Sequence, residues 1–147
     1  MTPTPVFGQT PKVSSTTVAA ANTKSDGAGT VATDIFKAAT IGASGAAPGA
    51  RVRWIPTATA AATATAATTA RVFVSTVGSS TTSSADTYLV AEISLPAVTA
   101  DHSTTAVPFY EITLPFPLPA NSFIHVTNHV APNANTAWRA TVSWMDL

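Results

Sequence analysis

The chain has no cysteine and few charged residues, and these two absences exclude several kinds of function. Without cysteine there is no disulfide scaffold, thiolate metal site or cysteine nucleophile, and the redox compartment is left open. Lysine, arginine, aspartate and glutamate make up 10% of the 147 residues, well below the roughly 25% of an ordinary soluble domain. Seven basic residues balance seven acidic ones, so no net field attracts nucleic acid or anionic lipid. We therefore expect no nucleic-acid partner and no membrane partner.

Long apolar runs are missing as well. The longest run of small residues, 57–70, is rich in threonine and contains no Leu, Ile, Val or Phe, whereas a membrane-spanning helix needs about 20 predominantly apolar residues. The first ten residues, MTPTPVFGQT, lack the basic region and apolar core of a secretory signal. We therefore expect synthesis in the cytoplasm of the producing cell.

Eleven prolines and seven glycines divide the sequence into pieces that are short for helices of average length. Within these pieces, polar or bulky residues alternate with β-branched ones, which is typical of strands with one solvated face. The pattern predicts about eight strands, at residues 13–20, 31–36, 51–55, 71–74, 88–93, 109–114, 123–130 and 138–144. Eight short strands without a convincing helix favour an all-β fold, a single-domain antiparallel β-sandwich of jelly-roll type.

The same alternation predicts which side chains share a face of each strand. In the 88–93 strand the expected shared face consists of Leu89, Ala91 and Ile93. In the last strand, Trp138 and Trp144 alternate with small apolar residues, and we expect both to lie in the core.

The alanine-rich stretch 58–70 has a helical alternative, because alanine is the best helix former. Its threonines would lose side-chain freedom in a helix, and no capping box or apolar stripe accompanies them. We therefore prefer strand–loop–strand over helix for this stretch.

The beginning of the chain differs from the rest. Three prolines within the first eleven residues fix backbone angles and remove hydrogen-bond donors, so we expect an extended arm over residues 1–11 and a β-sandwich domain over 12–147. Such an arm can lie on a neighbouring subunit, although a frayed terminus explains the prolines equally well. The arm residues expected at a capsid or subunit interface are Pro5, Val6, Phe7 and Pro11.

The histidines are the first candidates for metal binding or catalysis. His125 and His129 are four residues apart, but in a strand this spacing separates their Cα atoms by about 13 Å, too far to share one zinc ion. A bend before His129 would change that distance, yet no acidic residue lies between Glu111 and Asp146. We expect ordinary surface or core-edge histidines and no metal.

Catalytic and phosphate-binding motifs are equally weak. The residues 42–45, Gly-Ala-Ser-Gly, resemble a nucleophile turn only loosely and are expected to form a plain loop. Asp101 and His102 are adjacent, so their side chains diverge in an extended backbone. The SDGAGT segment lacks the lysine of a phosphate-binding loop. The two arginines near Trp54 form a basic surface too small to indicate nucleic-acid binding. We predict no enzyme activity, no catalytic residue and no cofactor.

What the sequence does contain is an abundance of small side chains. It has 29 alanines, 26 threonines and 13 serines. These side chains lose little entropy when an interface forms, and small neutral surfaces suit close packing against other chains. The composition favours a structural protein that works as a homo-oligomer or as part of a lattice.

Several segments resemble the small head decoration or cement proteins of tailed bacteriophages. The similarity rests on TPVFGQTPK near the N-terminus, AANTKSDGAGT at 20–30, ARVFV at 70–74 and LPFPLPANSFIHVT at 114–127. The alanine- and threonine-rich stretch 57–69 departs from that pattern. The resemblance implies a jelly-roll or related sandwich that binds the outer surface of the capsid and clamps adjacent major capsid subunits without chemistry.

It also implies a virion location, the major capsid protein as partner, and self-association as a homodimer or homotrimer. Some related sandwiches form parts of tail or head fibres, so the alternative is a carbohydrate- or host-surface-binding module. That alternative requires exposed aromatic residues, and the candidates are Trp54, Trp138 and Trp144. Three buried tryptophans would count against it.

Overall fold

The computed structural model describes residues 10–59, 63–100 and 107–147, and in these residues all regular structure is β-strand. The prediction of an all-β fold is confirmed. No helix in the described residues is long and apolar enough to cross a lipid bilayer. A helix was the alternative for the stretch 58–70, and its described residues, 58–59 and 63–70, contribute only strand and loop.

Eight strands of five or more residues form the framework. They are β1 (Thr10–Val18), β3 (Phe36–Thr40), β4 (Ala50–Ala58), β6 (Thr68–Ser75), β8 (Thr87–Leu95), β10 (Tyr110–Leu114), β11 (Phe123–Asn128) and β12 (Thr136–Asp146). Four short strands of two residues each were not predicted: β2 (Gly29–Thr30), β5 (Thr63–Ala64), β7 (Thr81–Thr82) and β9 (Thr99–Ala100).

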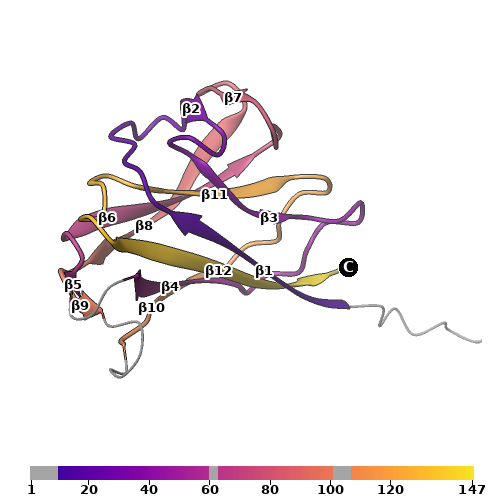
Figure 1. Ribbon diagram of the computed structural model, residues 1–147. Coiled ribbons are helices and arrows are strands. Elements are labelled where there is room, and N and C mark those ends of the chain that lie inside the picture. Colours follow the sequence, from indigo (N-terminus) through magenta and orange to yellow (C-terminus); the bar gives the residue numbers. More distant parts are fainter. Residues whose placement is uncertain (1–9, 60–62, 101–106) are drawn as a thin grey trace, which may run out of the picture.

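The framework strands form two sheets that pack face to face (Figure 1). Sheet A has the order β1-β12-β4-β10 and sheet B the order β3-β11-β6-β8, and every neighbouring pair is antiparallel. Among the framework strands, the first pairs with the last, the second with the second-last, and so on inward. This nesting of strand pairs is the jelly-roll topology.

The main core lies between the two sheets. Alternate residues of β4 and β12 point inward, and Trp54 and Trp138 are fully buried there while Trp144 is 7% exposed. The ring of Tyr110 meets the ring of Trp138 edge to face, with centroids 5.8 Å apart. Such aromatic pairs add stability beyond the apolar area they bury. The expectation that Trp138 and Trp144 are core residues is confirmed.

The strand predicted at 31–36 is displaced, because β3 begins at Phe36. Residues 30–35 form a turn in which the Thr30 carbonyl accepts the N–H groups of Thr33 and Asp34. The Asp34 carboxylate accepts the Thr30 N–H at 2.6 Å, and Ala32 has a positive φ of 69°. Local bonding by the aspartate side chain therefore overrides the β-propensity of the neighbouring valine and isoleucine.

The predicted face of the 88–93 strand is also wrong at one position. The register between β6 and β8 shifts between Val72 and Phe73, so that Ala91 lies opposite Val72 and Leu89 opposite Phe73. One additional residue in β8, Val90, reverses the alternation, as a β-bulge does. Leu89 therefore lies on the outer face of sheet B.

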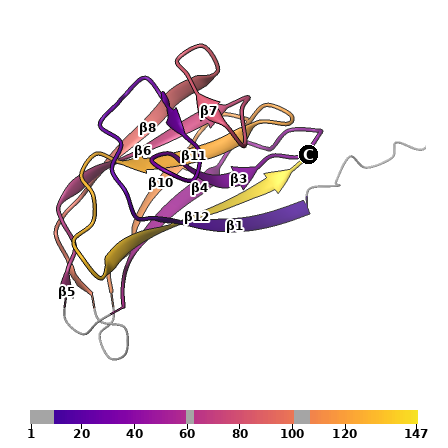
Figure 2. The same ribbon diagram turned by 45° about the horizontal axis from the view of Figure 1, so that its top comes forward.

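Two long connections cover the outer face of sheet B. We call residues 19–35 and 76–86 the cap; they carry β2 and β7, which pair with each other above β11 and β6 (Figures 1 and 2). Under the cap, Ile35, Phe73 and His125 are fully buried. The N–H of Asn22 donates to the carbonyl of Asn128, which fastens the cap to the end of β11. The molecule thus has a second, smaller core outside the sandwich.

Candidate functional site

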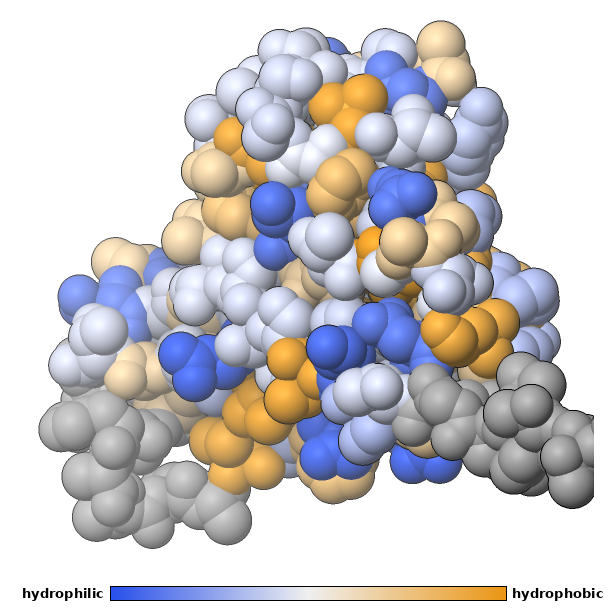
Figure 3. All heavy atoms as spheres, turned by 90° about the vertical axis from the view of Figure 1, so that its right-hand side faces the viewer, coloured by the Kyte–Doolittle hydropathy of each residue, from blue (hydrophilic) through white to orange (hydrophobic). Residues whose placement is uncertain are grey.

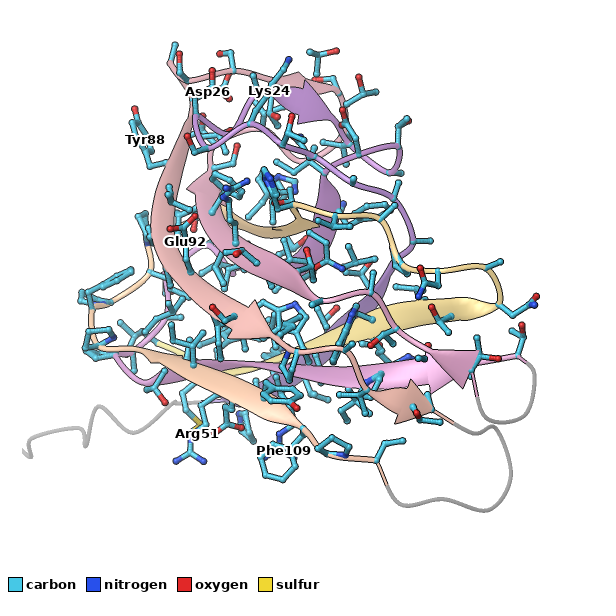
Figure 4. All side chains as sticks on the ribbon, turned by 90° about the vertical axis from the view of Figure 1, so that its left-hand side faces the viewer. Lys24, Asp26, Arg51, Tyr88, Glu92 and Phe109 are labelled. Carbon is cyan, nitrogen blue, oxygen red and sulfur yellow. The ribbon has the colours of Figure 1, made fainter. Side chains whose placement is uncertain are left out.

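Among the described residues no segment covers the outer face of sheet A, and this face, which we call the open face, is the candidate functional surface. It carries the side chains that alternate with the core positions, and many are serine or threonine. Val13 on β1 is 71% exposed. In the view of Figure 4, Arg51 and Phe109 lie below the lower sheet and point away from the sandwich.

A cluster of charged and aromatic side chains occupies the β4–β10 side of the open face. Glu111 is directly opposite Arg53 in the register, so the Arg53 Nε donates to Glu111 Oε2 at 3.0 Å and Nη2 lies 2.9 Å from the same oxygen. The Arg51 Nη1 is 3.8 Å from Glu111 Oε1. The Arg53 guanidinium stacks over the Phe109 ring at 4.3 Å. Register and stacking together hold Arg53 in a fixed orientation at the surface.

The described strand positions of the open face carry an excess of positive charge. Arg139 of β12 is exposed and lies opposite Ile55, which places it on this face with Arg51 and Arg53. Glu111 is the acidic residue among these strand positions. A shallow depression of about 210 Å³ lies between them, lined by Val13, Arg51, Arg53, Glu111, Thr141 and Ser143. Guanidinium and hydroxyl groups of this kind bind carboxylates and carbonyl oxygens of a partner.

The two histidines of FIHVTNHV lie in different surroundings. His125 is fully buried under the cap, and its Nε2 is 2.7 Å from the Val77 carbonyl, so Nε2 carries the proton and donates it. His129 is exposed, with its Nδ1 3.5 Å from Nη1 of Arg71. Of the histidines expected at the surface or core edge, His129 is at the surface, whereas His125 is fully buried in the smaller core under the cap. No group of three or more metal-binding side chains occurs in the part of the chain that the structure describes.

Burial lowers the pKa of His125 from its usual value of 6.5, and the positive charge of Lys37 acts in the same direction. The hydrogen bond to Val77 and the carboxylate of Asp86 raise the pKa and oppose this shift only in part. The other ring nitrogen, Nδ1, has no hydrogen-bond partner among the described residues. His125 is therefore held neutral as part of the cap structure.

Asp86 organises the 83–87 turn of the cap. Its carboxylate accepts the N–H of Ser83 at 2.9 Å and the hydroxyls of Ser83 and Thr87, each at 2.7 Å. The Ser83 N–H, followed by the two hydroxyls, lowers the pKa of Asp86. The Thr87 hydroxyl also contacts Ser75 on β6, so the turn is tied to sheet B.

The remaining predicted residues fall in three places. Pro5, Val6 and Phe7 lie outside the described residues, as do Asp101 and His102. Pro11 is exposed and is the second residue of β1, opposite Met145 of β12. The 42–45 segment forms a tight turn, with the Gly45 N–H donating to the Gly42 carbonyl, as expected for a plain loop.

Two hollows that could admit a small ligand lie beside the cap and at one end of sheet B. A hollow of about 380 Å³ between the cap and β3 is lined by Thr16, Val31, Ala32, Phe36, Lys37, Gly78 and Ser79. A hollow of about 450 Å³ lies at the end of β6 and β8, beside His129 and Val130. In either hollow, few polar side chains converge on one point.

Apolar residues on the surface are dispersed. The end of the molecule shown in Figure 3 has separate hydrophobic areas among pale, small polar residues. The three tryptophans that would have carried a carbohydrate site are all buried. The exposed aromatic side chains in the described residues are Tyr88 and Phe109, each 57% exposed.

Sequence reasoning singled out Arg51 and Arg53 but missed their association with Phe109 and Glu111. The signal was present in the alternation of both strands, since Arg53 and Glu111 are each on a polar face. Their pairing depends on the register between β4 and β10, which are far apart in the sequence.

The fold defines the chain as a jelly-roll sandwich with a capped sheet. No family model and no curated protein sequence matches it. Among solved structures, it is similar to a chain of the cyanophage Pam1 capsid asymmetric unit, with 17% identity, a TM-score of 0.45, and coverage of 100% of this chain and 92% of that one. It is also similar to the K3 cleaved adhesin domain of Lys-gingipain from Porphyromonas gingivalis, with 17% identity, a TM-score of 0.41, and coverage of 78% and 65%.

Proposed function

We propose that this chain is a non-enzymatic structural protein of a bacteriophage virion, a decoration or cement protein on the outer surface of the head. It binds major capsid subunits, stabilises the contacts between them, and works as a homodimer or homotrimer. The observation that carries the proposal is the open face: a four-stranded surface of small side chains, with arginines and the exposed Phe109, that no described segment covers.

Side-chain entropy favours binding through the open face. Serine, threonine and valine lose little freedom when a partner covers them, so such a face binds at a low ordering cost. Arg53 is already held between Glu111 and Phe109, and therefore loses less freedom on binding than a mobile arginine. Arginine and aromatic side chains are the ones that most often dominate binding energy at protein interfaces.

The test is co-sedimentation of the purified protein with phage heads that lack it. We expect stoichiometric binding to heads, and heads that resist heat or chelation better when the protein is bound. Val13→Asp places a charge on the β1 side of the open face and should weaken binding at least about tenfold. Val130→Asp is the matched control, because Val130 is also exposed but follows β11 on sheet B. Equal binding by both variants would contradict the open face as the capsid contact.

The expected contribution of the arm is tested separately. A variant that lacks residues 1–9 keeps all of β1, which begins at Thr10. If Pro5, Val6 and Phe7 reach a neighbouring subunit, this variant folds normally and binds heads more weakly than the full chain. Unchanged head binding would reject the arm while leaving the open face in place.

A carbohydrate- or host-surface-binding module is the second candidate. The observation in its favour is the exposed ring of Phe109 beside arginines, since exposed aromatic rings stack on sugars. A glycan array with the wild-type chain and with Phe109→Ala distinguishes the two functions. Glycan binding that Phe109→Ala abolishes, together with no binding to heads, would replace the first proposal with the second.

A further inference from the structure

The two outer sides of the sandwich carry opposite charge. The described strand positions of the open face hold three arginines and one glutamate: Arg51, Arg53, Arg139 and Glu111. The outer side of sheet B, with its cap, holds three basic and four acidic residues: Lys24, Lys37, Arg71, Asp26, Asp34, Asp86 and Glu92. Figure 4 shows Arg51 below the lower sheet, and Lys24 and Asp26 at the other end of the molecule. The open face therefore has an excess of positive charge, and the opposite side a small excess of negative charge.

The arginines of the open face form one row across β4 and β12. Arg51 and Arg53 are two residues apart in β4, so they share a face and their Cα atoms are about 6.6 Å apart. Arg53 lies opposite Thr141. Arg139 precedes Thr141 by two residues and is therefore a diagonal neighbour of Arg53, about 7–8 Å away. Three guanidinium groups are thus carried by a short stretch of the surface.

One end of this row has no partner within the described fold. Glu111 accepts a hydrogen bond from Arg53 at 3.0 Å and lies 3.8 Å from Arg51. Arg139 is exposed, and it forms no hydrogen bond or ion pair with the residues that the structure describes. A guanidinium group in this state can bind a carboxylate through two parallel hydrogen bonds. The row therefore has capacity for carboxylates beyond that of Glu111.

The acidic residues of the chain itself fit this row poorly. Residues 1–9 contain no aspartate or glutamate. In the cap, Asp26, Asp34 and Asp86 each accept a backbone N–H and so are engaged in local turns. Docking of a cap on the open face of another copy would also be a head-to-tail contact, which produces rings or filaments. Complementary carboxylates are therefore expected on a different protein.

Nucleic acid matches the row less well than a protein does. Duplex DNA carries one negative charge per about 1.7 Å of its axis, whereas the row offers three guanidinium groups and includes the Glu111 carboxylate. Val13, Thr141 and Ser143 line the depression beside the arginines. Such small side chains cost little to order against a folded surface. The charge and the shape of the open face together favour an acidic protein surface.

We propose that the open face binds an acidic patch of its partner protein, whose aspartate or glutamate carboxylates pair with Arg139 and Arg51 on either side of Arg53. This inference rests on the proposed function, in which the partner is a major capsid subunit. Opposite charges steer the encounter of two proteins and disfavour wrong orientations. The chain therefore docks with its open face toward the acidic patch and its cap toward solvent.

The first test measures binding to phage heads that lack the protein, at about 0.05 M and about 0.5 M salt. We expect high salt to lower the affinity at least about fivefold, mainly through slower association. At low salt, Arg139→Glu should weaken binding at least about tenfold. Arg139→Gln should weaken binding in the same direction by a smaller factor. Circular dichroism should show that both variants fold as the wild type does.

The matched control is Lys24→Glu, which makes the same change of charge at an exposed position of the cap. It gives the chain the same net charge as Arg139→Glu, and it should bind heads as the wild type does. Equal weakening by Lys24→Glu and Arg139→Glu would show an effect of net charge alone and would overturn the inference.

The second test measures binding of the purified chain to labelled poly-L-glutamate and to labelled duplex DNA at low salt. We expect the wild type to bind poly-L-glutamate and Arg139→Glu to bind it at least about fivefold more weakly. Binding to DNA without binding to poly-L-glutamate would overturn the inference in favour of nucleic acid. Self-association that high salt and Arg139→Glu both abolish would overturn it in favour of the cap of a second copy.

The two tests together separate this inference from the proposed function. Head binding that is independent of salt and of Arg139 would overturn this inference alone. Arg139-dependent binding to poly-L-glutamate without any binding to heads would overturn the proposed function alone. Binding to neither heads nor poly-L-glutamate would overturn both.

Discussion

The two outer faces of this sandwich differ in whether the loops cover them. Over sheet B, the cap buries Phe73 and His125 completely, whereas on sheet A the side chain of Val13 is 71% exposed. Both faces belong to four-stranded antiparallel sheets, so the strand architecture does not cause the difference. It comes from two long connections that fold back over the same sheet. Sheet B thus gains a second core, and the described residues leave the outer face of sheet A open to a partner.

The largest expected effect comes from matched phenylalanine truncations on the two faces. Phe73→Ala should lower the free energy of unfolding by about 3–5 kcal/mol, because it leaves a cavity under the cap. Phe109→Ala should cost less than about 1 kcal/mol, since its ring is 57% exposed and stacks on the side chain of Arg53 at the surface. Urea unfolding followed by tryptophan fluorescence measures both. Similar losses in the two variants would contradict the contrast between the faces.

Two glycines with positive φ sharpen the comparison at the level of the backbone. Gly27 in the cap has a φ of 78°, and a Cβ there would lie 2.6 Å from Cγ2 of Thr87. Gly49 has a φ of 99°, and a Cβ there would meet nothing within 4 Å. Alanine at either position adds about 1 kcal/mol of backbone strain, but only Gly27→Ala adds about 1–3 kcal/mol of overpacking. Thermal unfolding should show the larger loss for Gly27→Ala; a larger loss for Gly49→Ala would argue against a tightly packed cap.

The stability of the capped side should depend on pH through His125. Burial lowers the pKa of His125 in the folded chain, so below pH 6.5 the unfolded chain binds the proton first. The free energy of unfolding is therefore constant above that pH and falls as the pH decreases toward the folded-state pKa, by at most about 1.4 kcal/mol per pH unit. Urea unfolding at pH 8 and pH 5.5 measures this. The control is His129→Gln, at an exposed position, which should leave the pH dependence of the free energy of unfolding intact. If this variant loses the pH dependence, His129 and not His125 causes it, and the prediction is wrong.

The smallest expected effect concerns ion pairs. Glu111→Gln removes the pairs with Arg51 and Arg53, whose side chains are 60% and 43% exposed. The loss should be under about 1 kcal/mol and should vanish near 1 M salt, because solvent screens exposed charges. Glu92→Gln should cost more and keep part of its effect in salt, because Arg71 is only 11% exposed. Urea denaturation curves at low and high salt distinguish the Glu111→Gln and Glu92→Gln variants. An equal salt dependence of the two losses would contradict the expectation that solvent screens the Glu111 pairs more than the Glu92 pair.

Much of the fold could be predicted from residues that alternate strictly. Trp138 and Trp144 alternate with small apolar residues in β12 and face the core, as their spacing indicates. Most of the described prolines and glycines lie in connections, but Pro11 lies within β1 and Pro56 within β4. These features are local, so a single strand contains the information that determines them.

The features that escaped prediction depend on contacts between distant segments or on turn bonding. The bulge at Val90 arises from the match between β6 and β8 and reverses the face of Leu89. β3 begins later than predicted because the carboxylate of Asp34 accepts a hydrogen bond from the Thr30 N–H and holds the preceding residues in a turn. At the candidate site, the stacking of Arg53 on Phe109 required the β4–β10 register. Period-two patterns contain no information about which strand pairs with which.

The pairing of β1 with β12 has a consequence for how the chain folds. Thr10 lies opposite Asp146, so the first strand of sheet A finds its partner only when the last strand is made. At a synthesis rate of about 5–20 residues per second, β1 remains without that partner for seconds on the ribosome. Contacts between such distant segments also fold slowly once the chain is complete. We expect low temperature to raise the yield of soluble protein, since cooling weakens the hydrophobic association of chains whose sheet A has not yet closed.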